Sequence, residues 1–234
     1  AVIVAVEEGE LSEQRIERSV ERVLRLKERL GLLDEPFVDP DEVSSALGTE
    51  ADLEVAQAVG EAAATVLSDD EGWLPLERHW RILLTGPRPE GAGALARGLT
   101  EAGHTTTIAW SGADPGLAAI DEAVRRARGH DVTINVTDHL GAYPAQRTLV
   151  SRVLAAARRP IVVYAGSPYD ATWFPTAPAA VATYSTVPVS MRGLARVLSG
   201  EVEATGSLPV RIPNPGRPGR ALYGFGHGLT PVRR

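Results

Sequence analysis

The sequence has no cysteine, one lysine, one methionine and few aromatic residues. Without cysteine, disulfides and thiolate metal ligands are excluded. The formal net charge of −6 argues against a surface for nucleic acid or anionic membranes, because such surfaces cluster Lys and Arg. No apolar run approaches the roughly 18 residues of a membrane-spanning helix. These absences leave an ordinary globular protein without a membrane span or a nucleic-acid partner.

The chain has 234 residues, of which 44% are hydrophobic and 23% are charged. This length fits one medium domain with appendages, or two small domains. The first six residues lack the basic region of a signal peptide, and the first residue is not methionine. We therefore expect the sequence to be a piece of a longer or processed protein.

Near the amino terminus, residues 12–30 have the apolar spacing of an amphipathic helix, with Ile16 and Val20 on one face. Ser12 suits the N-cap, and Gly31 suits the left-handed residue after the helix. Two interpretations remain open. The helix packs on the sheet of its own domain, or its apolar face belongs to a neighbour that this sequence lacks.

Residues 34–48 contain two prolines and five acids without a clear period, which predicts an extended linker. A second helix is expected over 50–67, followed by a turn at Gly72 and a short extended piece at 74–76.

From Arg81 onward, apolar runs of strand length alternate with helical patterns, which is typical of a parallel sheet covered on both faces. The expected strands are 82–85, 105–109, 132–136, 161–164, 181–184 and 208–210. The expected helices are 92–102, 116–128, 145–158 and 188–198. This order predicts a flavodoxin-like, doubly wound α/β domain with a mostly parallel sheet in three layers. We expect a helical segment at 1–33, a linker at 34–49, the α/β domain at 50–212 and a Pro/Gly-rich tail at 213–234.

Three familiar motifs are absent or incomplete. Gly91–Ala96 fits G-x-G-x-x-A, but its glycines come late after the strand and no acid ends the next strand, so a dinucleotide site is not supported. Ser167 lacks the flanking glycines of a nucleophile elbow. The five histidines lack the spacing of a metal site, so we expect no metal.

Polar and aromatic candidates follow two expected strands. Asp138 and His139 come after residues 132–136, at the edge where open α/β sheets bind ligands. Neighbours on an extended strand point in opposite directions, so a loop-capping role for Asp138 competes with a proton-relay pair. For Asp170, the competing role is a local turn bond.

The loop after residues 161–164 is rich in proline and aromatic side chains, with Tyr169, Trp173 and Phe174 close together. A solvated connector does not need three aromatic residues, so we expect a ligand or a partner to cover them. No pair of carboxylates has a sequence context that suits a glycosidase. The residues alone therefore predict a fold and an interface, but no active site.

Several ordered stretches together resemble the C-terminal half of family 3 glycoside hydrolases. They are GELSEQRI at 9–16, EGWLPL at 71–76, SPYD at 167–170, ATYS at 182–185, PVSM at 188–191, VLSGE at 197–201, GSLPV at 206–210 and LYGFGHGL at 222–229. The resemblance implies that residues 1–33 are the last helix of a catalytic (β/α)8 barrel. It also implies that the rest is the second domain of the enzyme.

Within the family, the PYD, ATYS and FGHG segments resemble the bacterial β-N-acetylhexosaminidase branch, which removes terminal N-acetylglucosamine from cell-wall or chitin-type oligosaccharides. The resemblance places the aspartate nucleophile and a histidine–aspartate acid/base pair in the barrel, outside this chain. The β-glucosidase branch instead takes an acid/base glutamate from the loop after the third strand of the second domain. The matching loop here, residues 137–143, contains no glutamate.

The resemblance thus implies a chain with no catalytic residue and no cofactor, whose partners are its own barrel and the oligosaccharide. Asp138, His139, Tyr169, Asp170, Trp173 and Phe174 become candidates for the barrel-docking edge or the substrate cleft. A free-standing binding module and a β-glucosidase-branch domain remain alternatives. The branch also suggests an exported or cell-envelope enzyme, although a cytoplasmic one fits as well.

Overall fold

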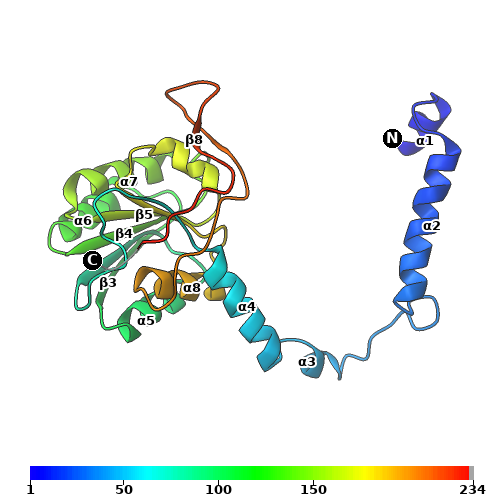
Figure 1. Ribbon diagram of the computed structural model, residues 1–234, viewed down its shortest axis with the longest axis horizontal. Helices are drawn as coiled ribbons and strands as arrows, with labels where there is room; N and C mark the ends of the chain where they lie inside the picture. Colours follow the sequence, from blue (N-terminus) through cyan, green and yellow to red (C-terminus); the bar gives the residue numbers. More distant parts are fainter. Residues whose placement is uncertain (232–234) are drawn as a thin grey trace. The chain divides into compact units, whose positions relative to one another are not determined.

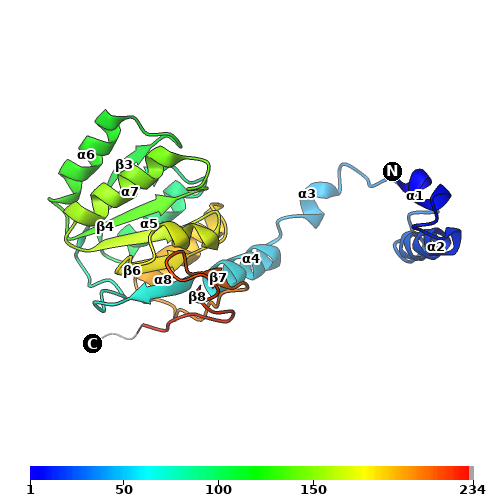
Figure 2. The same cartoon turned by 90° about the horizontal axis from the view of Figure 1, so that it is seen from above.

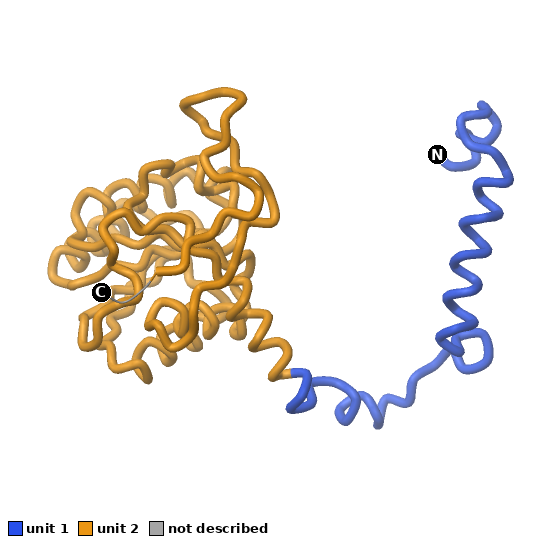
Figure 3. Tube along the Cα trace, in the orientation of Figure 1, with its two compact units in different colours: residues 1–52 blue, residues 53–234 orange. Residues whose placement is uncertain are grey.

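The computed structural model describes residues 1–231. Contacts divide the chain into two compact units, Ala1–Asp52 and Leu53–Arg234, which Figure 3 shows in different colours.

The first unit contains α1 (Val2–Glu7), α2 (Glu13–Arg29) and α3 (Val43–Ala46). As predicted, Ser12 caps α2, since its hydroxyl accepts a hydrogen bond from Arg15 N at 3.2 Å, and Gly31 follows with φ +71°. No residue of α2 is buried. The prediction of a linker without a helix over 34–48 was wrong at α3, where Asp39 accepts a hydrogen bond from Asp41 N just before the turn.

Helix α4 (Glu50–Ala63) begins at a reciprocal cap between Thr49 and Asp52. It ends earlier than expected, because Thr65–Asp69 forms β1 instead of the last helical turn. The predicted helix over 64–67 was wrong. The β-branched pair Thr65 and Val66 lies against β6, and burial on both faces of the sheet outweighs the helical period of the sequence.

A six-stranded sheet forms the centre of the second unit, in the order β1-β6-β5-β4-β2-β3. The strands after β1 are β2 (Arg81–Pro87), β3 (Thr105–Ser111), β4 (Val132–Thr137), β5 (Pro160–Tyr164) and β6 (Ala179–Ala182). β2 to β6 run parallel in the flavodoxin-like order, and β1 pairs antiparallel with β6. The predicted fold class is confirmed.

Helices cover both faces of the sheet (Figures 1 and 2). α5 (Ala92–Glu101) and α8 (Pro188–Leu198) lie on one face, while α6 (Leu117–Ala127) and α7 (Pro144–Ala156) lie on the other. Alternate residues of β5 serve the two layers: Val163 joins the core under α5 and α8, and Val162 and Tyr164 join the opposite core.

Small residues allow the helices on the first face to approach closely. A Cβ on Gly98 of α5 would lie 2.7 Å from the Ala195 side chain of α8. A Cβ on Gly60 of α4 would lie 2.7 Å from the Val189 carbonyl oxygen, and one on Gly193 would overlap the Gly60 backbone. These glycines are required by packing rather than by their backbone angles.

The carboxyl-terminal segment pairs with the rest of the unit. β7 (Ile212–Pro213) pairs with β8 (Ala221–Tyr223), and Leu229 N donates to Val66 O at 2.9 Å. The expected strand over 208–210 was wrong: Leu208 exchanges backbone hydrogen bonds with Gly226 and His227, but Pro209 has no N–H with which to continue the ladder.

Candidate functional site

The carboxyl ends of β4 and β5 bring three of the six candidate residues together. The two strands are parallel neighbours, with Thr137 opposite Tyr164, and Ala165 N donates to Thr137 O one step beyond that pair. Asp138 and His139 directly follow β4. Asp170 lies in the 3-10 helix η1 (Pro168–Trp173), which follows β5.

Asp138 and His139 form a pair, with Asp138 Oδ1 2.5 Å from His139 Nδ1. The expectation that these neighbours point in opposite directions was wrong, because the strand ends at Thr137 and His139 takes the left-handed conformation, with φ +52°. Both side chains reach solvent, at 40% exposure for Asp138 and 65% for His139. The Asp138 carboxylate lies over Gly166, where any side chain would displace it.

The buried side chain of Gln146, in α7, holds the backbone of this loop. Its Oε1 accepts from Asp138 N at 3.1 Å, and its Nε2 donates to Asp138 O and to Ala113 O, both at 3.0 Å. One amide thereby fixes the loops that follow β3 and β4. The pair of Asp138 and His139 is presented on a rigid backbone and can exchange hydrogen bonds with a hydroxyl or amide group of a ligand.

Asp170 has a structural partner rather than a catalytic one. Its Oδ2 accepts from Leu140 N at 3.1 Å, which ties η1 to the loop after β4. The local turn bond proposed for Asp170 was wrong, because Ser167 accepts the bond from Tyr169 N at the start of η1. Asp170 is only 6% exposed, and this burial raises the pKa of its carboxyl above the usual range.

Trp173 and Phe174 line a hollow of about 470 Å³ between η1 and α7. The Arg147 guanidinium lies 4.0 Å from the centre of the Trp173 ring, a cation–π contact. Phe174 packs on the core beneath, whereas Tyr169 and Trp173 are each 47% exposed. Of the three aromatic residues in this loop, Phe174 therefore packs on the core, and Tyr169 and Trp173 are exposed.

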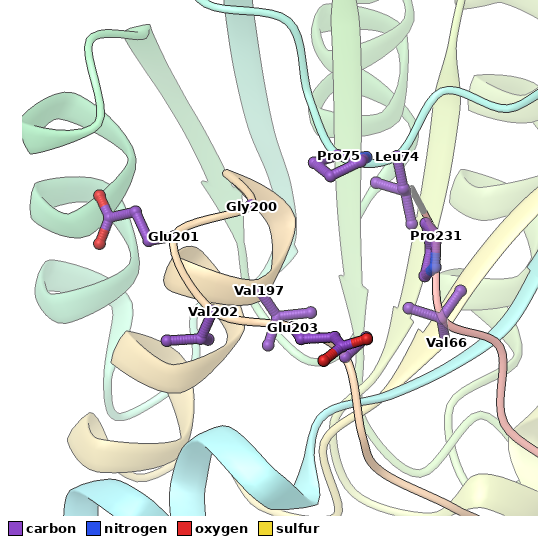
Figure 4. A pocket seen from close by; sticks show the side chains of 10 residues that line it. Val66, Leu74, Pro75, Val197, Gly200, Glu201, Val202, Glu203 and Pro231 are labelled. Atoms are coloured by element: carbon purple, nitrogen blue, oxygen red, sulfur yellow. The ribbon is translucent and has the colours of Figure 1, made fainter. Parts of the chain in front are cut away.

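A second hollow, of about 250 Å³, lies between β1 and the end of α8 (Figure 4). Its lining is mainly apolar, with Val66, Leu74 and Val197 facing the space and Glu203 beside it. None of the six candidate residues lines it. Its volume lies below the usual range of ligand sites, and the charged side chains of its described lining are two glutamates, Glu201 and Glu203, so it is a weaker candidate than the edge with Asp138 and His139.

The sequence did not single out Gln146 or Arg147. The helix begins at Tyr143 and Pro144, and this start places Gln146 and Arg147 near the edge of the sheet. Their short distance in sequence from Pro144 was the one feature of the sequence that could have indicated them. Within residues 1–231, no three His, Asp or Glu side chains are placed to hold a metal ion. Among the same residues, no helix combines the length and the apolar character needed to cross a membrane.

Comparison with known proteins shows the family to which the domain with this sheet edge belongs. The sequence model described as "Glycosyl hydrolase family 3 C-terminal domain" matches residues 64–230. The chain belongs to this family. The matched region contains the whole sheet, both loops of the candidate site and the segment through β8.

Relatives within the family carry several activity names. "Beta-N-acetylglucosaminidase/beta-glucosidase" of Cellulomonas fimi is 26% identical over 230 residues, which are 88% of this chain and 40% of that protein. "Probable beta-glucosidase C" of Aspergillus flavus is 38% identical, but over only 77 residues, 33% of this chain and 12% of that protein.

Among solved structures, a family 3 β-N-acetylglucosaminidase from Paenibacillus sp. has a TM-score of 0.66 at 26% identity, over 87% of this chain and 40% of its own. A β-glucosidase from Listeria innocua has a TM-score of 0.70 at 19% identity, over 98% of this chain and 41% of its own, which shows the shared fold. This chain thus spans less than half of the length of these enzymes.

Proposed function

We propose that this chain is the non-catalytic second domain of a retaining glycoside hydrolase that removes terminal β-linked N-acetylglucosamine from cell-wall or chitin-type oligosaccharides. In this proposal, the edge with Asp138, His139 and Trp173 borders the substrate cleft and packs on the catalytic barrel. The barrel supplies the nucleophile and the acid/base group.

One observation carries the non-catalytic role: the described residues of the candidate site contain no free pair of carboxylates. Asp170 is buried and bound to Leu140 N, and Asp138 is paired with His139. A glycosidase needs two carboxyl groups, or an equivalent pair, on either side of the scissile bond. This edge can therefore bind and shape a substrate, but it lacks the groups that cleave one.

The N-acetylglucosamine specificity is supported by sequence identity over most of the chain. Relatives whose names include that activity are 26% identical over 87% and 88% of this chain, whereas the Listeria innocua β-glucosidase is 19% identical over 98%. The loop at 137–143 also has an Asp-His pair in place of the glutamate that the resemblance places in β-glucosidases. The β-glucosidase alternative is favoured by a different observation, namely the 38% identity of the Aspergillus flavus relative over its 77 residues.

A direct comparison of substrates separates the two specificities. The protein that joins this chain to its barrel is assayed with nitrophenyl β-N-acetylglucosaminide and nitrophenyl β-glucoside under matched conditions. We expect kcat/KM to be at least about tenfold higher for the N-acetylglucosaminide, a difference of about 1.4 kcal/mol in transition-state binding. A preference for the glucoside would overturn the proposed specificity without affecting the non-catalytic role.

A further inference from the structure

The hollow between η1 and α7 is lined by groups that donate hydrogen bonds. Four polar residues of α7 line it, at spacings that place them along one side of the helix: Arg147, Thr148, Ser151 and Arg152. Trp173, at the end of η1, and Phe174, which follows it, add two aromatic rings. No Asp or Glu of the described residues lines this hollow. Its lining therefore suits a ligand that is rich in hydrogen-bond acceptors.

Arg147 carries a charge that no acid of the described chain neutralises. Its guanidinium lies 4.0 Å from the centre of the Trp173 ring. Among residues 1–231, its side chain takes part in no ion pair and no hydrogen bond. A guanidinium placed over an aromatic ring is restrained by that ring, while its N–H groups remain free to donate. Such a group is prepared to bind two oxygens of one carboxylate or phosphate at once.

Arg152 is positioned by the neighbouring helix. α6 and α7 lie side by side on this face of the sheet (Figures 1 and 2), and Arg152 Nη2 donates to Asp121 Oδ1 of α6 at 2.6 Å. Asp121 offsets the charge of Arg152 but does not line the hollow. The charge that remains for a ligand is therefore that of Arg147.

Two hydroxyl groups complete the set of donors. Thr148 and Ser151 are exposed, and their hydroxyls form no hydrogen bond with any other group of residues 1–231. A hydroxyl can donate to an anionic oxygen or accept from a hydroxyl of the ligand.

The size of the hollow indicates more than a single inorganic ion. Its volume of about 470 Å³ falls within the usual range of small-molecule sites. It is many times the share of one water molecule, about 30 Å³. A ligand that fills it has an uncharged body beside its anionic group, and Phe174 offers that body an apolar surface.

The local charge of this hollow is opposite to that of the chain, whose formal net charge is −6. The other hollow of this domain, beside α8, is lined by Glu201 and Glu203. Because exposed charges are screened beyond about 10 Å at 0.1 M salt, the nearest groups decide which ligand is attracted. An anion is thus attracted to the hollow beside Arg147 and repelled from the one beside α8.

We propose that the hollow between η1 and α7 is a binding site for a small organic anion, whose carboxylate or phosphate group is held by Arg147 with Thr148 and Ser151. The inference goes beyond the proposed function, because it requires no group of the barrel and assigns the ligand no part in cleavage. Carboxylate and phosphate share the chemistry that this site recognises, and the test separates them.

Three sugars with the same ring test the ligand class: glucuronate, glucose 6-phosphate and neutral glucose. Each is titrated into the full chain, residues 1–234, at low ionic strength in a calorimeter. We expect at least one of the two anions to bind about tenfold or more tightly than glucose. Binding of only one anion identifies the group that the site takes. Equal binding of glucose and the anions, or no binding of either anion, would overturn the proposal.

Variants of the lining test the location of the site. Arg147→Gln should raise the dissociation constant of the anion about tenfold or more, and Arg147→Lys should raise it less, since lysine keeps the charge but lacks the planar fork. The matched control is Arg125→Gln, which makes the same change of charge on α6, outside the hollow, and should leave the constant unchanged. Equal effects of Arg147→Gln and Arg125→Gln would show a response to net charge alone and would contradict the site. Unfolding midpoints show that each variant is folded.

The same titration of the longer protein that includes the barrel separates this inference from the proposed function. In that function Trp173 borders the cleft, so the hollow should remain open and the anion should bind with a similar dissociation constant. Loss of binding in the longer protein would assign the hollow to the contact with the barrel. That result would overturn the ligand site and leave the non-catalytic role of the domain intact.

Discussion

Asp138 Oδ1 and His139 Nδ1 lie 2.5 Å apart, although the two residues are neighbours in the chain. The pair forms because His139 turns into the left-handed conformation as the backbone leaves β4. Gln146 holds the backbone of Asp138 by a hydrogen bond, and the side chains of Asp138 and His139 are both exposed to solvent. In the proposed function, this pair is the polar group of the edge that contacts the bound sugar.

The first prediction concerns His139 in the enzyme that carries the barrel. His139→Asn, which tolerates a positive φ, should raise KM for an N-acetylglucosaminide about fivefold with little change in kcat, because one hydrogen bond of about 1 kcal/mol to the bound sugar is lost. The matched control is His130→Asn, at the opposite end of β4. If KM were unchanged in His139→Asn, the Asp138–His139 pair would not border the substrate cleft.

The second prediction uses the buried carboxyl of Asp170. Since burial raises its pKa in the folded state, the folded protein binds this proton more tightly than the unfolded chain does. This contribution to stability is complete below the unfolded pKa, about 3.9, and is lost as the pH rises through the folded value. Asp170→Asn carries no charge and can still accept the Leu140 N–H. Its unfolding free energy relative to wild type should therefore increase from pH 4 to pH 7.

Urea unfolding at the two pH values measures this difference. Asp170→Ala is the comparison, because it leaves the buried Leu140 N–H without its acceptor and should cost about 1–3 kcal/mol. A relative stability of Asp170→Asn that falls with rising pH would contradict the assignment of Asp170 as a buried, destabilised carboxylate.

The third prediction compares two glycines of the same helix, α5. Gly98→Ala should destabilise the domain by about 1–3 kcal/mol, because the new methyl group meets Ala195 of α8. Gly93→Ala faces open space apart from the end of Arg97, at 3.7 Å, and should stabilise by up to about 1 kcal/mol through helix propensity. Thermal or urea unfolding of the two variants and the wild type measures these changes in stability. Equal effects of the two substitutions would mean that α5 and α8 do not cross at Gly98.

The fourth prediction concerns α2. Its apolar side chains include Val20 and Leu24, which are 50% and 48% exposed, and they line a hollow along the helix. If they belong against a barrel, removal of residues 1–33 should increase solubility and leave the unfolding free energy of the rest unchanged. The full chain with Val20→Lys and Leu24→Lys should show the same gain. Loss of cooperative unfolding on deletion would instead show that the helix belongs to this domain.

Periodicity predicted the parallel part of the fold well, because β2, β4, β5 and β6 are buried runs of strand length between clear helical stripes, and β3, although only partly buried, is a β-branched run between two of them. It failed at β1, where Val66 and Leu67 continue the helical stripe of α4. The pairing of Val66 with Val181 of β6, more than a hundred residues later, overrides that local signal. It also failed at Leu208, whose partners are two backbone groups near the end of the chain.

The candidate site was less predictable. Strand ends placed Asp138, His139 and Asp170 at one edge, but the Asp138–His139 contact depends on a backbone angle that no residue pattern reveals. The contribution of Gln146 depends on hydrogen bonds to two separate loops. Such contacts arise from tertiary structure, and sequence spacing alone does not contain them.

The most direct test of the central claim is an assay of the purified chain, residues 1–234, on nitrophenyl β-N-acetylglucosaminide beside the longer protein that includes the barrel. If catalysis resides in the barrel, the longer protein should release nitrophenol and this chain should release none above the blank. Turnover that rises in proportion to the concentration of this chain, and that follows it through a further purification step, would contradict the account.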